Sequence, residues 1–426
     1  MKLSKFNHIK DLNDGTLLIY NTLTSGVLRL NQEYSNYFQA FEKGECEINA
    51  ALENNLIKGG MIVDNDIDEI NALNLSGKLS KFSTNSLGLT IAPTLACNFK
   101  CPYCYEKGAH NETMSQDTQK RLVEFVKSQS NNVKTISITW YGGEPLLVFP
   151  IVEDLSKEIV DICEEKNIQY ESGMVTNGYL LSIDYAERMS RIGISSIQVT
   201  IDGDAEQHNQ RRICHDGSCT YDAILDNIEK CCNLLRIVIR VNVDKNNLSS
   251  FNVFLEDLKQ RRLSNKVNVY LAPVDDTNDA YMSDKCLSIT QFSDLEIDFY
   301  SKLMDNGFSQ VRMPTAMMGY CGAVSVNSFV IDPEGVFYKC WYEVGRVKSN
   351  VGNLLDGIKL NSNHSRWIFY DAFNDTECMG CKMLPICFGG CPDKALSSNS
   401  NKCKTTKYNV DKMLDLLNSV DNSDKK

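Results

Sequence analysis

Cysteine is the residue type whose number and spacing in this sequence most clearly indicate chemistry. The chain has 17 cysteines in 426 residues, and three of them gather as Cys97-x3-Cys101-x2-Cys104. Seven more follow near the carboxyl end, as Cys321, Gly335-x4-Cys340 and Cys378-x2-Cys381-x5-Cys387-x3-Cys391-x11-Cys403. No secretory signal is evident, so we expect a reducing compartment, where clustered thiols point to metal or redox chemistry rather than disulfides.

The first group fits an iron-sulfur cluster better than a zinc ion. Three thiolates can hold three irons of a cubane and leave the fourth iron open to a small chelating molecule. A structural zinc ion needs four protein ligands, and the nearest further candidate is His110. Zinc therefore stays open as an alternative for this loop.

A second motif lies after the next predicted strand, as Gly142-Gly143-Glu144-Pro145. Together with the cysteine loop and its aromatic Tyr103, it resembles the radical S-adenosylmethionine (SAM) superfamily. That resemblance implies a [4Fe-4S] cluster on Cys97, Cys101 and Cys104, with SAM chelating the open iron. Electron transfer would then cleave SAM to a 5'-deoxyadenosyl radical, which takes hydrogen from an unactivated carbon.

The same resemblance implies which residues contact SAM. The segment His208-Asn209-Gln210-Arg211-Arg212 is similar to the family's H-D-x-x-R, with Asn209 at the position of the usual Asp. For His208 a structural hydrogen bond and a catalytic role both stay open. The expected SAM contacts are Tyr103, Gly142, Gly143, Glu144, Thr176, Asn177, Thr200, Asp202 and Arg212.

The carboxyl-terminal pattern resembles the SPASM extension of radical SAM enzymes, with all seven cysteine positions present. The resemblance implies two auxiliary [4Fe-4S] clusters, hence three clusters in all. Cys321, Cys340 and Cys391 would hold the first auxiliary cluster and leave one iron open. The second would be held by Cys378, Cys381, Cys387 and Cys403. Zinc is again the alternative, because C-x2-C pairs also occur in zinc ribbons.

The other cysteines have weaker signals. Cys163, Cys231 and Cys232 lie on predicted helices, where we expect small apolar packing residues. The roles of Cys214, Cys219 and Cys286 stay open.

These residues must be positioned by an α/β scaffold. Apolar runs alternate with helical segments, which predicts a parallel sheet and a partial (β/α)6 radical SAM barrel with functional loops at the carboxyl ends of its strands. We expect an amino-terminal module over residues 1–78, the barrel over 87–310 and the SPASM domain over 311–426, with a linker at 76–86. The predicted strands are 87–92, 135–140, 168–175, 196–201, 237–243 and 267–271.

The sequence of the amino-terminal module predicts a short hairpin followed by helices. Residues 16–20 and 26–30 flank a turn, and Tyr34, Tyr37, Phe38 and Phe41 repeat at helical spacing. This order is winged-helix-like and resembles the peptide-recognition element of ribosomal-peptide maturases, which adds a leader segment to its sheet edge. A capping or dimerising domain is the alternative.

The composition of the chain argues against nucleic acid and membrane as partners. The 44 basic against 55 acidic residues give a net charge of -11, so no diffuse cationic face for nucleic acid is expected. No apolar run approaches the length of a membrane span. We therefore expect a cytoplasmic protein.

The resemblance implies an enzyme that modifies a ribosomally made precursor peptide. Our main prediction is Cys thioether crosslinking of the sactipeptide or ranthipeptide type, after hydrogen abstraction from a peptide carbon. Alternatives are oxidation of Cys or Ser as in sulfatase maturation, carbon-carbon crosslinking, epimerisation, and a non-catalytic iron-sulfur electron carrier. Expected partners are the precursor peptide with its leader and an electron donor such as flavodoxin or ferredoxin.

Overall fold

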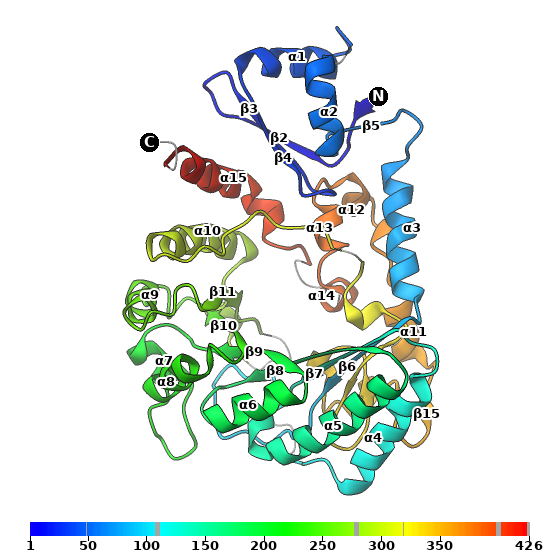
Figure 1. Ribbon diagram of the computed structural model, residues 1–426, viewed down its shortest axis with the longest axis vertical. Helices are drawn as coiled ribbons and strands as arrows, with labels where there is room; N and C mark the ends of the chain where they lie inside the picture. Colours follow the sequence, from blue (N-terminus) through cyan, green and yellow to red (C-terminus); the bar gives the residue numbers. More distant parts are fainter. Residues whose placement is uncertain (48, 107–110, 277–280, 318, 398–401, 424–426) are drawn as a thin grey trace. The chain divides into compact units, whose positions relative to one another are not determined.

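The computed structural model describes residues 1–47, 49–106, 111–276, 281–317, 319–397 and 402–423 (Figure 1). The chain forms two compact units. Unit 1 comprises Met1–Phe82, Arg312–Cys321 and Phe369–Lys426, and unit 2 comprises Ser83–Val311 and Gly322–Ile368. His110, the candidate zinc ligand, lies outside the described residues.

Unit 2 is built on a parallel sheet that confirms the six predicted strands. Neighbouring strands pair in chain order and in parallel, because a helix returns the chain to the same end of the sheet after each strand. Apolar residues that face the helices form a continuous core around Trp140, Phe149 and Phe254. The strands are β6 (Ser86–Ile91), β7 (Thr135–Trp140), β8 (Gln169–Thr176), β9 (Ile194–Thr200), β10 (Arg236–Val243) and β11 (Val267–Pro273).

The connecting helices follow the outer side of these strands (Figure 1). Each presents an apolar stripe to the sheet, as Ile224, Leu225 and Ile228 do on α8. Within the described residues, no helix combines the length and apolar character that a membrane crossing requires. The helices are α4 (Gln116–Gln129), α5 (Phe149–Glu165), α6 (Ile183–Arg191), α7 (Ala205–Arg211), α8 (Tyr221–Cys231), α9 (Phe251–Gln260) and α10 (Ile289–Asp305).

The sheet of unit 2 continues past the six predicted strands. β12 (Ser328–Ile331) pairs in parallel with β6, and β13 (Phe337–Tyr338) pairs antiparallel with β12. Gly335 makes the turn between them with φ +80°, and Cys340 follows β13. At the other edge, the Gln310 side chain hydrogen-bonds the backbone N–H and C=O of Val269 on β11.

Residues 341–368 complete unit 2. They form the short strands β14 (Gly352–Asn353) and β15 (Gly357–Ile358), which pair antiparallel, and the helix α11 (Ser362–Ile368). Trp367 on α11 is fully buried.

Unit 1 begins with a three-stranded antiparallel sheet, in the order β2 (Asn7–Asp11), β3 (Leu17–Asn21) and β4 (Val27–Leu30). The predicted hairpin is therefore confirmed, and β2 was missed. The predicted helix after it is α1 (Gln32–Glu42), which is followed by α2 (Ala50–Lys58); their amino ends are capped by Asn31 and Asn49. β1 (Lys2–Leu3) pairs with β5 (Ile62–Val63).

The predicted linker at residues 76–86 is too long, because only residues 83–85 lie between helix and strand, where unit 1 gives way to unit 2. Residues Glu69–Phe82 form the helix α3, although their Ser, Lys and Asn content suggested a loop. Leu73, Gly77 and Lys81 recur every four residues and are all buried, so tertiary packing overrides local composition. A Cβ on Gly77 would lie 2.6 Å from the ring of Phe388, which shows how closely α3 packs within unit 1.

The carboxyl-terminal part of unit 1 shares cores with its first 82 residues. Leu18 and Tyr20 of β3 pack with Met383 and Ile386 in one apolar cluster. The amino-terminal sheet therefore does not bury its apolar residues by itself. The helices here are α12 (Thr376–Gly380), α13 (Leu384–Cys387), α14 (Pro392–Leu396) and α15 (Thr406–Ser423).

Candidate functional site

A cavity of about 290 Å³ opens at the carboxyl ends of the parallel strands in unit 2. It brings together three cysteines and loops from most of the strands, as the barrel prediction requires. Seven of the nine predicted SAM contacts line it, namely Tyr103, Gly142, Gly143, Thr176, Asn177, Thr200 and Arg212. Cys97, Cys101 and Cys104 line it as well.

The cysteine loop, residues 97–104, is hydrogen-bonded to the segment that precedes α8. The backbone N–H of Lys100 donates to Ile213 O at 2.8 Å, and that of His215 donates to Asn98 O at 3.0 Å. The Cys214 thiol also donates to Asn98 O at 3.4 Å. Cys214, whose role the sequence left open, is thus a buried packing residue that holds the loop.

Gly142 and Gly143 allow the chain before Cys97 to pass very close. A Cβ on Gly142 would lie 2.5 Å from Thr94 O, and one on Gly143 would lie 2.2 Å from Ala96 O. Backbone hydrogen bonds from Gly143 N to Thr94 O (3.1 Å) and from Glu144 N to Ala96 O (2.9 Å) fix this approach. The two glycines therefore shape the cysteine loop in addition to lining the cavity.

Glu144 is fully buried and faces the loop after β8. Its carboxylate accepts hydrogen bonds from Thr176 Oγ1 (2.7 Å), Asn177 N (2.7 Å) and Leu146 N (2.9 Å). Burial raises the pKa of this carboxyl group, and these hydrogen bonds lower it in part. In this structure Glu144 positions the Thr176–Asn177 loop, and its predicted contact with SAM stays a prediction.

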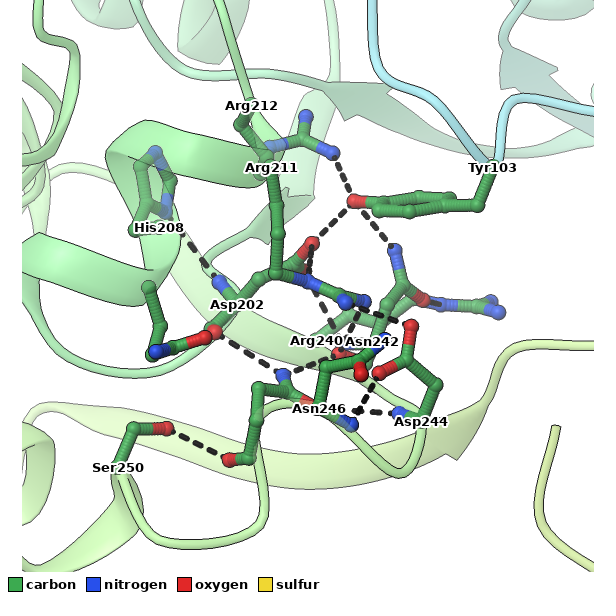
Figure 2. Close-up of polar contacts among 12 residues, drawn as sticks. Tyr103, Asp202, His208, Arg211, Arg212, Arg240, Asn242, Asp244, Asn246 and Ser250 are labelled. Carbon is green, nitrogen blue, oxygen red and sulfur yellow. Dashed lines mark hydrogen bonds and ion pairs between the residues drawn. The ribbon is translucent and has the colours of Figure 1, made fainter. Parts of the chain in front are cut away.

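A network of buried charges lies beside the cavity (Figure 2). Arg211 bridges two carboxylates, with Nε 3.3 Å from Asp202 Oδ2 and Nη1 2.6 Å from Asp244 Oδ2. Both aspartates are fully buried. The Tyr103 hydroxyl donates to the same Asp202 oxygen, so Asp202 joins the cysteine loop to the ends of β9 and β10. Sequence reasoning named Asp202 but missed Arg211 and Asp244.

Arg212 has a different environment from Arg211. Its Nη1 donates to Tyr103 Oη at 3.0 Å, and its guanidinium lies 5.5 Å from the ring centre of Phe99. Its Nε is buried and has no hydrogen-bond partner among the described residues. A buried donor on the cavity wall that lacks a partner fits an anionic group of a bound molecule.

His208 and Asn209 have structural roles. His208 is fully buried, its Nδ1 accepts from Asp202 N at 3.3 Å, and its Nε2 contacts Thr220 Oγ1 at 3.1 Å. Burial lowers its pKa well below 6.5, so it stays neutral. Asn209 Oδ1 accepts from the backbone N–H of Thr220 (2.8 Å) and of Tyr221 (3.1 Å), which caps α8.

The cavity also contains residues that sequence reasoning missed. Tyr141 stacks on Trp341 with ring centres 5.4 Å apart, and Tyr105 meets Tyr342 edge to face at 5.0 Å. Arg240 on β10 also lines the cavity. Tyr105 and Trp341 directly follow Cys104 and Cys340, so their positions in the sequence could have indicated them. Their ring partners, Tyr342 and Tyr141, come from distant segments of the chain and could not be predicted in this way.

The three cysteines of this loop are half-buried along the cavity wall. Burial raises the pKa of Cys97 and of Cys104 to about 12. Such thiols stay protonated unless a bound cation stabilises the thiolate. Among the described residues, no three Cys, His, Asp or Glu side chains converge as they would around a single metal ion.

A second cysteine-lined cavity lies in unit 1. Cys378, Cys381, Cys387 and Cys403, the four predicted ligands of the second auxiliary cluster, all line it. Asp375 caps α12 and so fixes Cys378, accepting from Cys378 N at 3.3 Å. A Cβ on Gly390 would lie 1.8 Å from Lys402 O, so this glycine lets the segment before Cys391 approach the segment that carries Cys403.

The remaining cysteines are distributed as follows. Of the first auxiliary set, Cys321 and Cys391 belong to unit 1 and Cys340 to unit 2, and their common site stays a prediction. Cys163 and Cys231 are buried in the core of unit 2 and Cys232 packs against it, as predicted. Cys219 is exposed. The Cys286 thiol contacts Met282 O at 3.6 Å.

Residues 91–258 match the model of the radical SAM superfamily, and the chain therefore carries a radical SAM domain. TigE of Paramaledivibacter caminithermalis, a radical SAM cyclopropyl synthase, is 22% identical over 91% of this chain and 89% of its own. The GTP 3',8-cyclase of Clostridium perfringens is 31% identical over 44% of this chain and 53% of its own, about half its length.

Two groups of solved structures share the fold. The anSMEcpe protein with bound AdoMet and Kp18Cys peptide has a TM-score of 0.61 at 20% identity, covering 79% of this chain and 99% of its own. SuiB of Streptococcus suis, bound to the precursor peptide SuiA, has a TM-score of 0.55 at 16% identity, covering 95% and 98%. These likenesses show that the fold is common to the three proteins.

Proposed function

We propose that this chain is a radical SAM enzyme that forms Cys thioether crosslinks in a ribosomally made precursor peptide. The observation that carries the proposal is the cavity of unit 2, which is lined by Cys97, Cys101, Cys104 and Arg212. The buried Nε of Arg212 has no hydrogen-bond partner in the part of the chain that the structure describes. The fold shared with SuiB and anSMEcpe, both solved with peptides, supports a peptide substrate.

The residues of this cavity fit SAM and a [4Fe-4S] cluster. Three thiols supply three iron ligands, and Arg212 offers a donor for the carboxylate of SAM. When bound, SAM and its cluster supply a 5'-deoxyadenosyl radical that abstracts hydrogen from a peptide carbon. Gly142 and Gly143 keep the cysteine loop in place, and Glu144 positions Thr176 and Asn177. The Asn177 side chain in turn donates to Asn98 Oδ1 of the cysteine loop at 2.7 Å.

The carboxyl-terminal cysteines suit the second half of the reaction. Joining a carbon radical to a thiol releases the thiol proton and one electron, so an electron acceptor is required. We assign this role to the auxiliary clusters, with Cys378, Cys381, Cys387 and Cys403 supplying a complete ligand set for one of them. Cys321, Cys340 and Cys391 supply three thiolates to the other, and we infer that the peptide thiol provides the fourth ligand.

The amino-terminal sheet is the proposed leader site. β4 pairs with β3 on one side, and Val27 on β4 is 49% exposed. An added peptide strand would hydrogen-bond along such an edge. We expect Val27→Asp in the full-length protein to weaken leader binding, whereas Ile57→Asp, at a 46% exposed position on α2, should not. Equal binding by both variants in fluorescence anisotropy would reject this edge.

Mass spectrometry of a cysteine-rich peptide encoded beside the gene, after co-expression, tests the function. Each thioether should remove two hydrogens and one alkylatable thiol. The matched control is the protein with Cys97, Cys101 and Cys104 changed to Ala, which should leave the peptide unmodified. A peptide that gains links with this control would refute the proposed role of the three cysteines.

Carbon-carbon bond formation is the second candidate, because the similarity to the cyclopropyl synthase TigE extends over 91% of this chain. Such a bond also removes two hydrogens. It leaves every cysteine of the peptide alkylatable, so thiol alkylation before mass spectrometry separates the two products.

A further inference from the structure

Three lysines line the same cavity of unit 1 as the four cysteines of the second auxiliary site. Lys402, Lys404 and Lys407 come from one short segment around Cys403 and all lie on the cavity wall. Basic residues this near a cysteine group are not needed to ligate iron. Their N–H groups, and the charge of any lysine that no carboxylate neutralises, act on whatever the cysteines hold.

Two of the three lysines are paired with carboxylates. The Lys402 ammonium bonds to Asp375 and also interacts with the Cys378 thiol. The Lys407 ammonium lies 2.5 Å from Glu377 Oε1 and 3.7 Å from the Cys403 sulfur. Each pair leaves little net charge near the sulfurs, but each ammonium still presents a hydrogen-bond donor to one of them.

Lys404 differs, because its contacts are with uncharged atoms. Its ammonium donates to Ile386 O at 3.2 Å and lies 3.0 Å from Met317 Sδ. No carboxylate pairs with it among the described residues. It also interacts electrostatically with the thiols of Cys387 and Cys321, one from each predicted auxiliary ligand set.

We propose that Lys404, with donors from Lys402 and Lys407, raises the reduction potential of the second auxiliary cluster and so makes it an electron acceptor. A cubane with four thiolates is anionic and gains one more negative charge on reduction. A nearby cation and hydrogen bonds to the sulfurs stabilise that reduced form. The inference rests on the proposed function, because it assumes that these cysteines hold a cluster.

The test is a redox titration of the full-length protein followed by electron paramagnetic resonance. Changing Cys97, Cys101 and Cys104 to Ala silences the first cluster, and the signal that survives a further Cys340→Ala change is assigned to the second auxiliary cluster. On this background Lys404→Gln should lower the midpoint potential. A tenfold change in the oxidised-to-reduced ratio corresponds to about 59 mV for one electron.

Two matched variants and one iron measurement complete the design. Lys404→Arg keeps the charge and should retain the potential. Lys78→Gln removes a unit 1 lysine whose ammonium pairs with Asp371 at 3.6 Å and should not move it. An unchanged potential in Lys404→Gln with full iron content overturns the inference. If Cys378→Ala removes no iron, the auxiliary site itself is wrong, and the proposed function fails instead.

Discussion

The buried network around Arg211 makes the most demanding prediction, for the variant Arg211→Met. Asp202 and Asp244 are fully buried and share this one guanidinium. Without it, two carboxylates lose their counter-ion in a low-dielectric interior. Breaking a buried ion pair by removing one partner costs about 3–5 kcal/mol, which corresponds to a fall of roughly 6–20 °C in the melting temperature.

The destabilisation by Arg211→Met should also depend on pH, in a direction set by the pKa of Asp244. Burial alone would raise the pKa of Asp244, but hydrogen bonds from Arg211 and Tyr281 hold it below its usual value. A carboxyl group with a lowered folded pKa stabilises the protein above its unfolded pKa, and that contribution is lost as the pH falls through the folded pKa. The destabilisation by Arg211→Met should therefore be fully present near neutral pH and shrink as the pH falls below about 4.

Tryptophan fluorescence can follow the unfolding of unit 2 alone. All three tryptophans of the chain, Trp140, Trp341 and Trp367, belong to that unit, so thermal unfolding by tryptophan fluorescence does not report unit 1. The control is Arg261→Met, which removes a partly exposed arginine that contacts three carboxylates, those of Asp222, Asp226 and Glu229, and should cost about 0.2–1 kcal/mol. Equal and pH-independent effects of both variants would refute the electrostatic reasoning.

Two further predictions test the packing of the two cysteine sites, and a third tests the cap of α8. Gly143→Ala should displace the loop before Cys97 and lower iron content at the first cluster by about four irons. The control Gly307→Ala introduces backbone strain at φ +81°, but its Cβ meets nothing within 4 Å, so it should keep this iron. Gly390→Ala should remove iron from the second auxiliary site instead, because its Cβ overlaps a backbone carbonyl. Asn209→Ala should lower stability by about 1 kcal/mol through loss of the α8 cap, measured by the same fluorescence melt.

The sequence was most informative where side-chain chemistry and strand patterning are local. Spacing alone grouped Cys97, Cys101 and Cys104, and the same three residues line one cavity in the structure. The six parallel strands were predictable because apolar runs and amphipathic helices alternate strictly along residues 86–273. The glycine motif was also predictable, although its close approach to Thr94 and Ala96 depends on a neighbouring loop.

The contacts that sequence reasoning missed join segments far apart in the chain. Arg211 and Arg212 are adjacent, and nothing local says that the first pairs with Asp244 while the second faces the cavity. The second half of α3 was predicted to be a linker because its packing partner, Phe388, lies more than three hundred residues away from Gly77. Local composition cannot report such a partner.

An open parallel sheet has two unpaired edges, which are templates for association with other chains. In unit 2 each edge of the sheet is partly covered. β12 covers β6, and the strand that then becomes the edge, β13, has two residues. On β11 the Gln310 amide occupies the N–H and C=O of Val269, as a neighbouring strand would. The two edges of this sheet therefore present fewer free backbone groups to another chain than two bare edge strands would.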